Sequence, residues 1–366
     1  MKNLYLYILI PFFLYNQILF GKAPMHKIGI LLASHGDIDS LSELKPYLEK
    51  GITHMAPLPG NISGLVSRIG WPLFRAIYEP MYKSFGVKTY YRENTLKQVK
   101  ALQRQLDANG TDAKVYMGFN LLSPTVTEAL DEMKADGVEI IVLINQGAQY
   151  SMATRMNYMD VIDYLKNHSD YQPKVIGINQ YTQDERFRAL LVDSLKEDLS
   201  NYFPEGSSNN TCLLMTFHGI PATNVRKGDK STQDMLNLFE YVRSQFPEYK
   251  MYYGFLNENI IPFVKWTGPT AVESARKVGE ARAACSNVLM DARISFTVHP
   301  RIVLYDVNVL ARKEILNRNP SAMVVLAQNF NDNEKLARFF ADMAEEALNG
   351  RGDLSYLDMT STIGHH

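Results

Sequence analysis

The sequence is poor in cysteine and has no concentrated run of basic residues, and both absences limit what the protein can be. Cys212 and Cys285 are its two cysteines, so a disulfide framework, a CxxC pair and a cysteine-ligated iron–sulfur cluster are not expected. One disulfide between them is an alternative to two buried thiols, which we favour. The 38 basic and 39 acidic residues give a formal net charge of −1, so nucleic acid is not an expected partner.

Several motifs of nucleotide binding and catalysis are also missing. The first predicted strand is followed by His35-Gly36 rather than by spaced glycines, and there is no P-loop. HExxH is absent, and Ser34 and Ser151 lack the flanking glycines of a nucleophile elbow. Nucleotide binding is therefore disfavoured.

The first 21 residues differ from the rest of the chain. Lys2 precedes an apolar run over residues 4–14, which Asn16-Gln17 interrupts. This run is shorter than the roughly 20 residues of a membrane-spanning helix, so residues 1–21 are typical of a signal peptide, with an N-terminal anchor as the alternative. We expect an exported protein, periplasmic or secretory, or one associated with a membrane through its N-terminus, and favour a cytoplasmic location less.

After this leader, apolar runs alternate with amphipathic stretches, which is the pattern of βαβ units and a parallel sheet. The runs predict strands over residues 27–33, 114–119, 138–144, 174–178, 211–217, 250–255 and 294–298. Apolar residues at three-to-four spacing predict helices over 96–106, 124–137, 190–199, 232–246, 270–284 and 333–348. The fold class is therefore α/β.

A break near residues 165–173 divides this rhythm into two similar halves. We predict two Rossmann-like domains, 27–165 and 174–332, with parallel sheets and an interdomain cleft, and expect the helix at 333–348 to complete the first. Such sheets bind ligands beyond the C-terminal ends of their strands. His35, His218 and His299 each follow a predicted strand, and three histidines at one cleft favour a site that handles protons or a metal.

The sequence resembles the ferrochelatase family, as a divergent class II-type chelatase, over nearly all of the chain after its leader. The most specific part is the strand and turn at 213–221, Leu-Leu-Met-Thr-Phe-His-Gly-Ile-Pro, followed by Arg226-Lys227-Gly228-Asp229. Further matches lie at 124–137, at Gln149-Tyr150-Ser151 with Thr154, at Trp266-x-Gly268-Pro269, and at Phe296-Thr297 with Leu304-Tyr305-Asp306.

The resemblance implies a chelatase-type fold, a porphyrin in the cleft, and insertion of Fe²⁺, the substrate metal, into protoporphyrin IX in haem biosynthesis. It gives His218 the role of the histidine that takes pyrrole protons or holds the metal. It also implies that His35, Tyr150, Ser151 and Trp266 lie near the tetrapyrrole.

One departure from the family concerns a carboxylate. The family has a glutamate opposite the histidine, and counting back from Leu304-Tyr305 places Ile302 at that position. We expect His299 to replace this carboxylate if Pro300 turns the chain, so that His218 and His299 line the cleft and hold the metal. Glu258 is a further candidate ligand.

Three functions remain open on the sequence. The first is a ferrochelatase, which we rank first because the residues around His218 match the family. The second is a tetrapyrrole- or haem-binding protein of the same fold that has lost turnover, which the leader favours slightly. The third is a periplasmic cobalt or sirohydrochlorin chelatase. The sequence sets neither the metal, the macrocycle nor the oligomeric state.

Overall fold

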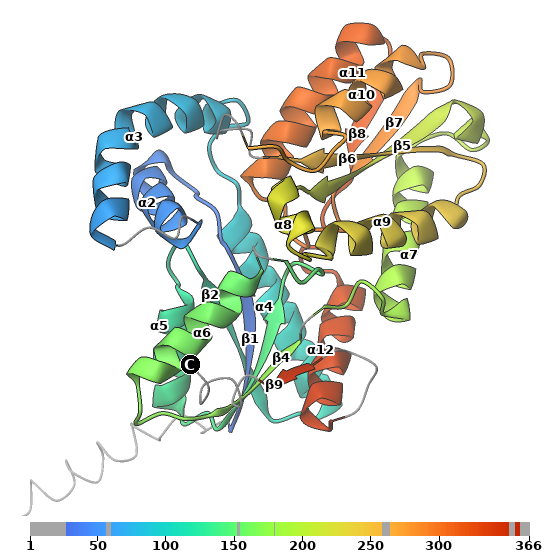
Figure 1. Ribbon diagram of the computed structural model, residues 1–366. Coiled ribbons are helices and arrows are strands. Elements are labelled where there is room, and N and C mark those ends of the chain that lie inside the picture. Colours follow the sequence, from blue (N-terminus) through green and yellow to red (C-terminus); the bar gives the residue numbers. More distant parts are fainter. Residues whose placement is uncertain are drawn as a thin grey trace, which may run out of the picture.

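The computed structural model describes residues 27–55, 60–151, 154–178, 180–257, 264–350 and 356–358. They form two α/β domains, each built on a mainly parallel sheet (Figure 1). The predicted fold class is therefore confirmed. The leader at 1–21 and Glu258 lie outside the described residues.

The first sheet has the strand order β2-β1-β3-β4-β9, with β9 antiparallel to β4 and the other pairs parallel. Its strands are β1 (Ile28–Ser34), β2 (Ala113–Phe119), β3 (Ile140–Asn145), β4 (Lys174–Ile178) and β9 (Tyr356–Asp358). The inner strand β1, between β2 and β3, is a nearly continuous apolar run that is buried on both faces. That is the pattern of a parallel strand covered by helices on each side.

Helices cover both faces of this sheet. The helices of this domain are, in chain order, η1 (Leu41–Glu43), α2 (Leu44–Met55), α3 (Gly60–Lys83), α4 (Tyr91–Asn109), α5 (Val126–Asp136), α6 (Arg155–Asn167) and, from the far end of the chain, α12 (Glu334–Leu348). Of these, α4, α5, α6 and α12 cover the sheet, whereas η1, α2 and α3 pack in a separate core. Ile30 and Leu32 point into the core shared with α4 and α12, whereas Leu31 and Ala33 point into the core shared with α5 and α6. This alternation along β1 gives three layers.

The second sheet repeats the arrangement of the first, with the order β6-β5-β7-β8 and all pairs parallel. Its strands are β5 (Thr211–His218), β6 (Lys250–Leu256), β7 (Asn287–Asp291) and β8 (Met323–Leu326). Its helices are α7 (Glu185–Tyr202), η2 (Ser207–Asn210), α8 (Ala222–Arg226), α9 (Ser231–Ser244), α10 (Ala271–Glu280), the π-helix η3 (Val303–Ala311) and α11 (Arg312–Arg318). In both sheets the first strand lies between the second and the third.

Two expectations are corrected by the structure. The predicted strand at 294–298 is a loop, and the strand of that region is β7. Ile294 and Val298 are apolar because they enter cores between elements, Val298 with Tyr91 and Phe119 of the first domain, and not because they pair in a sheet. Cys212 and Cys285 form a disulfide instead of two thiols, because β5 and the segment before β7 bring them side by side.

The loop over residues 292–302 joins the two domains. The Nε2 atom of Gln149 donates to the Ile294 carbonyl at 2.5 Å, and Nε2 of Gln98 donates to the Thr297 carbonyl at 3.0 Å. The main-chain N–H of Arg301 donates to Oδ2 of Asp37. Three first-domain side chains thus hold the backbone of a second-domain loop.

Among the described helices, none combines the length and the apolar character that a membrane crossing requires.

Candidate functional site

A cavity lies where the C-terminal ends of β1, β3 and β5 converge with the loop over 292–302. Residues of both domains line it: Ser34, His35, Gly36, Asp37, Tyr47, Tyr91, Gln146, Gly147, Gln149, Ser151, Thr154, Asn157, His218, Ile220, Ser231, Met235, Ser295, Phe296, Thr297, Pro300, Arg301 and Ile302. The cavity is where two sheets of this kind are expected to bind a ligand.

The turn after β1 builds the first-domain wall. Gly36 has a φ of 76°, and a Cβ at this position would lie 2.9 Å from the Phe119 side chain. Glycine is therefore required there. The carbonyls of Ser34 and His35 accept hydrogen bonds from the N–H groups of Asn120 and Leu121, at 3.0 and 3.2 Å. These contacts fix the backbone on which His35 and Asp37 are carried.

The His35 side chain is held by a polar chain that leads away from the cavity. Its Nδ1 atom lies 3.0 Å from Oδ1 of Asn120, and Nδ2 of Asn120 lies 2.5 Å from Oδ2 of Asp160 on α6. Asn120 is buried. The Nδ1 side of the imidazole ring is therefore anchored from outside the cavity.

Asp37 is a buried carboxyl group in the cavity wall. It accepts hydrogen bonds from the N–H of Ile38 at 2.8 Å, from the Tyr82 hydroxyl at 2.6 Å, and from the N–H of Arg301. Burial raises the pKa of Asp37, and these hydrogen bonds and the charge of Arg301 oppose the shift. The guanidinium of Arg301 lies over the Tyr78 ring, 5.2 Å from its centroid. The cavity thus contains an acid and a cation from opposite domains.

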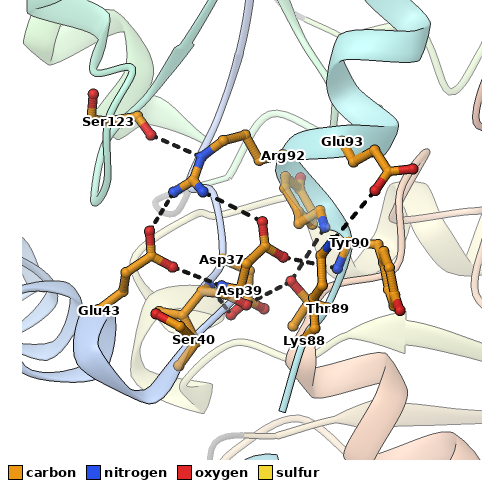
Figure 2. Close-up of polar contacts among 12 residues, drawn as sticks. Asp37, Asp39, Ser40, Glu43, Lys88, Thr89, Tyr90, Arg92, Glu93 and Ser123 are labelled. Carbon is orange, nitrogen blue, oxygen red and sulfur yellow. Dashed lines mark hydrogen bonds and ion pairs between the residues drawn. The ribbon is translucent and has the colours of Figure 1, made fainter. Parts of the chain in front are cut away.

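The segment after Asp37 is tied to the start of α4 (Figure 2). Arg92 contacts Glu43 at 2.7 Å and Asp39 at 3.4 Å, and its Nε atom donates to the Ser123 carbonyl at 3.1 Å. Asp39 also accepts from the N–H of Tyr90 at 3.0 Å. Arg92 therefore braces the loop that carries Asp37 against α4.

His218 forms part of the second-domain wall as the last residue of β5. Its N–H donates to Oγ of Ser295 at 3.1 Å, and its ring meets the Phe296 ring edge to face, with centroids 5.9 Å apart. The residues after Pro300 complete this wall: Pro300, Arg301 and Ile302 all line the cavity. His218 and Ile302 are thus brought to one cavity.

His299 is a predicted catalytic and metal-binding residue that does not line this cavity. Its neighbours Pro300 and Thr297 line the cavity, but His299 does not. Its Nε2 atom is buried and has no hydrogen-bond partner among the described residues. Burial, with a smaller effect from the charge of Arg293, lowers the pKa of His299 to about 3. The chain does turn at Pro300, but the turn directs Arg301 and Ile302 rather than His299 to the cavity.

Of the four residues predicted to lie near the tetrapyrrole, two line the cavity and two lie behind its walls. His35 and Ser151 line the cavity, whereas Tyr150 and Trp266 do not. Tyr150 packs edge to face on Tyr158, with centroids 5.9 Å apart, and Trp266 forms an isolated β-bridge with Pro221 in the turn after His218. Tyr150 and Trp266 therefore contribute to the walls from behind the lining.

Sequence reasoning missed Asp37, Arg301, Gln146 and Asn157 as cavity residues. Asp37 and Arg301 could have been predicted from the sequence, because each lies two residues after a predicted site histidine, His35 or His299. Gln146 lies just beyond the strand predicted at 138–144, whereas Asn157 carried no such signal: it projects from α6 and donates to Asn145.

The residues of this cavity can exchange protons with a bound ligand that has apolar surfaces. Imidazoles from both domains, a buried carboxyl group and apolar surfaces share one cavity, and neutral imidazole is both a base and a ligand for divalent metals. In the described part of the chain, no three His, Cys, Asp or Glu side chains gather as a metal site.

Comparison with known proteins agrees with this geometry. The family model described as Ferrochelatase matches residues 27–348. The chain is 22% identical to the mitochondrial ferrochelatase of Homo sapiens over 329 residues, 88% of this chain and 76% of that protein. It is 21% identical to the ferrochelatase of Herpetosiphon aurantiacus over 315 residues, 82% of this chain and 97% of that protein.

The fold also resembles a solved structure. SirB from Bacillus subtilis with Fe3+ has a TM-score of 0.53 and 11% identity, with 90% of this chain and 100% of that chain covered. At this identity the likeness concerns the fold alone. The family model, which extends over most of the two domains, decides the classification: the chain belongs to the ferrochelatase family.

Proposed function

We propose that the protein inserts ferrous iron into protoporphyrin IX to give haem. The observation that carries the proposal is that His218 lies at the end of β5 in a cavity shared by both domains, opposite the turn that carries His35. Insertion releases two pyrrole protons as Fe²⁺ enters the ring. The cavity therefore needs bases that are neutral near physiological pH, which imidazole supplies.

The cavity walls fit the second requirement of the reaction, a bent macrocycle. Bending turns the nitrogen lone pairs out of the ring plane, and a rigid cleft can impose it with binding energy from the ring faces. Phe296, Tyr91 and Ile302 provide apolar surface in the cavity, and three interdomain hydrogen bonds brace its second-domain loop.

Asp37 supplies a carboxyl group that the family comparison alone does not reveal. Ile302 occupies the position counted for the family's glutamate, and Asp37 reaches the same cavity from the first domain. Its hydrogen bond with Arg301 makes it first a structural group, so we assign the proton chemistry to the imidazoles.

A second function deserves its own test because Ile302 lines the cavity. An apolar residue at that position favours a protein that binds haem or another tetrapyrrole without turnover. A cobalt or sirohydrochlorin chelatase of the same fold is the third alternative.

One experiment separates the three. The purified full-length chain is incubated without oxygen with Fe²⁺, Co²⁺ or Zn²⁺, each with protoporphyrin IX or sirohydrochlorin, and the absorption spectrum is followed. Turnover with Fe²⁺ and protoporphyrin IX supports the proposal. Turnover with sirohydrochlorin alone supports the third function, and stoichiometric haem binding without insertion by any pair supports the second.

We also propose that the protein is exported, with its N-terminal segment acting as a signal peptide or anchor. The disulfide between Cys212 and Cys285 supports this proposal, because such bonds persist in oxidising compartments and are rare in the cytosol. Protein isolated from its source under alkylating conditions should then begin after the leader or fractionate with membranes, and should contain no alkylated cysteine. Two alkylated thiols and an intact Met1 in a soluble cytosolic fraction would exclude export.

A further inference from the structure

Three side chains from three elements form a chain behind the cavity. His35 follows β1, Asn120 follows β2, and Asp160 lies on α6. The His35 Nδ1 and Asn120 Oδ1 atoms are 3.0 Å apart, and the Asn120 Nδ2 and Asp160 Oδ2 atoms are 2.5 Å apart. Only His35 of the three lines the cavity.

The direction of these hydrogen bonds follows from the chemistry of the end group. An ionised carboxylate only accepts, so Asn120 must present its NH₂ group to Asp160 and its carbonyl oxygen to His35. A carbonyl oxygen only accepts as well, so Nδ1 of His35 must be the donor. In a neutral imidazole with the proton on Nδ1, the lone pair is on Nε2.

We propose that Asp160, acting through Asn120, is a positioning residue that holds His35 as the Nδ1–H tautomer and so makes Nε2 the atom that takes a proton or a divalent cation in the cavity. His35 then serves as a second imidazole, in the first domain, beside His218 of the second. Its use in metal insertion rests on the proposed function, whereas the tautomer does not.

The tautomer can be measured directly. Two-bond ¹H–¹⁵N correlation spectra of the full-length chain, labelled with ¹⁵N-histidine, distinguish a protonated from an unprotonated ring nitrogen. Spectra are taken at about pH 8.5, about two units above the ordinary imidazole pKa, and the His35 signals are assigned as those lost in His35→Gln. We expect a protonated Nδ1 and an unprotonated Nε2. A His35 that is Nε2–H, or an equal mixture, overturns the proposal.

The isosteric variant Asp160→Asn tests the role of the carboxylate. Asn at 160 can donate as well as accept, so the Asn120 amide can turn over and the His35 signals should show both tautomers. Asp163→Asn is the matched control: it removes the same charge from an exposed position on α6 and should leave the His35 signals unchanged. Equal thermal unfolding midpoints would show that both variants are folded. His35 signals that remain wholly Nδ1–H in Asp160→Asn overturn the proposal.

A calorimetric titration with Zn²⁺ alone, without porphyrin, tests whether the tautomer of His35 affects the affinity for a divalent cation. Loss of a residue that orients a metal-binding histidine typically costs about tenfold to a hundredfold in affinity, and we expect this for Asp160→Asn but not for Asp163→Asn. Equal Zn²⁺ affinities in the parent and Asp160→Asn would show that Asp160 does not prepare His35 to bind a divalent cation. If the parent has the expected tautomer but inserts no metal, the proposed function fails and the positioning role stands.

Discussion

The main-chain N–H of Arg301, in the second domain, donates a hydrogen bond to the buried carboxyl group of Asp37, in the first. Asp37 is at the same time the acceptor for the Tyr82 hydroxyl and for its neighbour Ile38. One side chain therefore joins the turn after β1 to the turn that carries Ile302, and both turns line the cavity. The shape of the cavity depends on this contact.

Asp37→Asn should weaken the contact without changing the size of the side chain. The amide keeps one acceptor oxygen but sets an NH₂ group against one of the three donors, which leaves a buried donor unpaired. We expect the free energy of unfolding in urea to fall by about 1–3 kcal/mol. Asp107→Asn, at an exposed position of α4, is the control and should change it by less than about 0.5 kcal/mol. Equal stability of Asp37→Asn and the parent would show that the contact contributes nothing.

His218→Ala should abolish insertion while the fold remains intact. Loss of a general base typically lowers a rate by about 10²–10⁴-fold, measured here as haem formed from Fe²⁺ and protoporphyrin IX. His168→Ala removes an imidazole that stacks on Tyr164, with centroids 3.9 Å apart, and that does not line the cavity, so its rate should equal the parent's. Parental activity in His218→Ala would refute the assignment of His218 as the base.

Ile302→Glu tests the missing carboxylate. A glutamate on the cavity wall would attract Fe²⁺ and accept a proton, so we expect faster insertion than in the parent, whereas Ile302→Gln, of similar size and without charge, should not show the gain. If the parent inserts no iron and Ile302→Glu does, the chain is a tetrapyrrole-binding relative that has lost its catalysis. If the two variants have equal rates, the charge at this position is irrelevant.

His299 should make stability depend on pH on the acidic side. Its pKa is lowered from the ordinary 6.5 to about 3 in the folded chain, so between these values the unfolded chain binds more protons than the native one. Stability therefore falls as the pH drops through this window. Urea unfolding between about pH 4 and 6 should show a steeper dependence in the parent than in His299→Asn, by about 1.4 kcal/mol per pH unit. Parallel curves would contradict the burial of this imidazole.

The sheets could be predicted from the sequence because parallel strands covered on both faces are short apolar runs. The observed β4 covers the predicted residues 174–178, β2 and β5 differ from prediction by one residue at one end, and β1 differs by one residue at each end. The strand prediction at 294–298 was wrong although it used the same signal, a short apolar run, that located the other strands. Burial produces apolar residues wherever it occurs, and Val298 is buried by the first domain.

The site was predictable only where a residue type is rare enough to be noticed. His218 and His35 were selected as histidines at strand ends, and both line the cavity. His299 met the same criterion and lies outside it, because one turn at Pro300 decides which side chain faces the ligand. The hydrogen bonds between His35 and Asn120 and between Asn120 and Asp160 join residues 85 and 40 positions apart, and no local sequence pattern indicates such pairs.

The last helix, α12, determines the order in which the molecule can be completed during synthesis. It packs on α4, β3 and β4 of the first sheet, and its Phe340 and Met343 are buried there. The ribosome makes that sheet's first four strands early, yet the part of one face that α12 covers stays exposed until more than a hundred later residues have emerged and the second domain has been made. The domain that begins the chain is therefore the last to be finished.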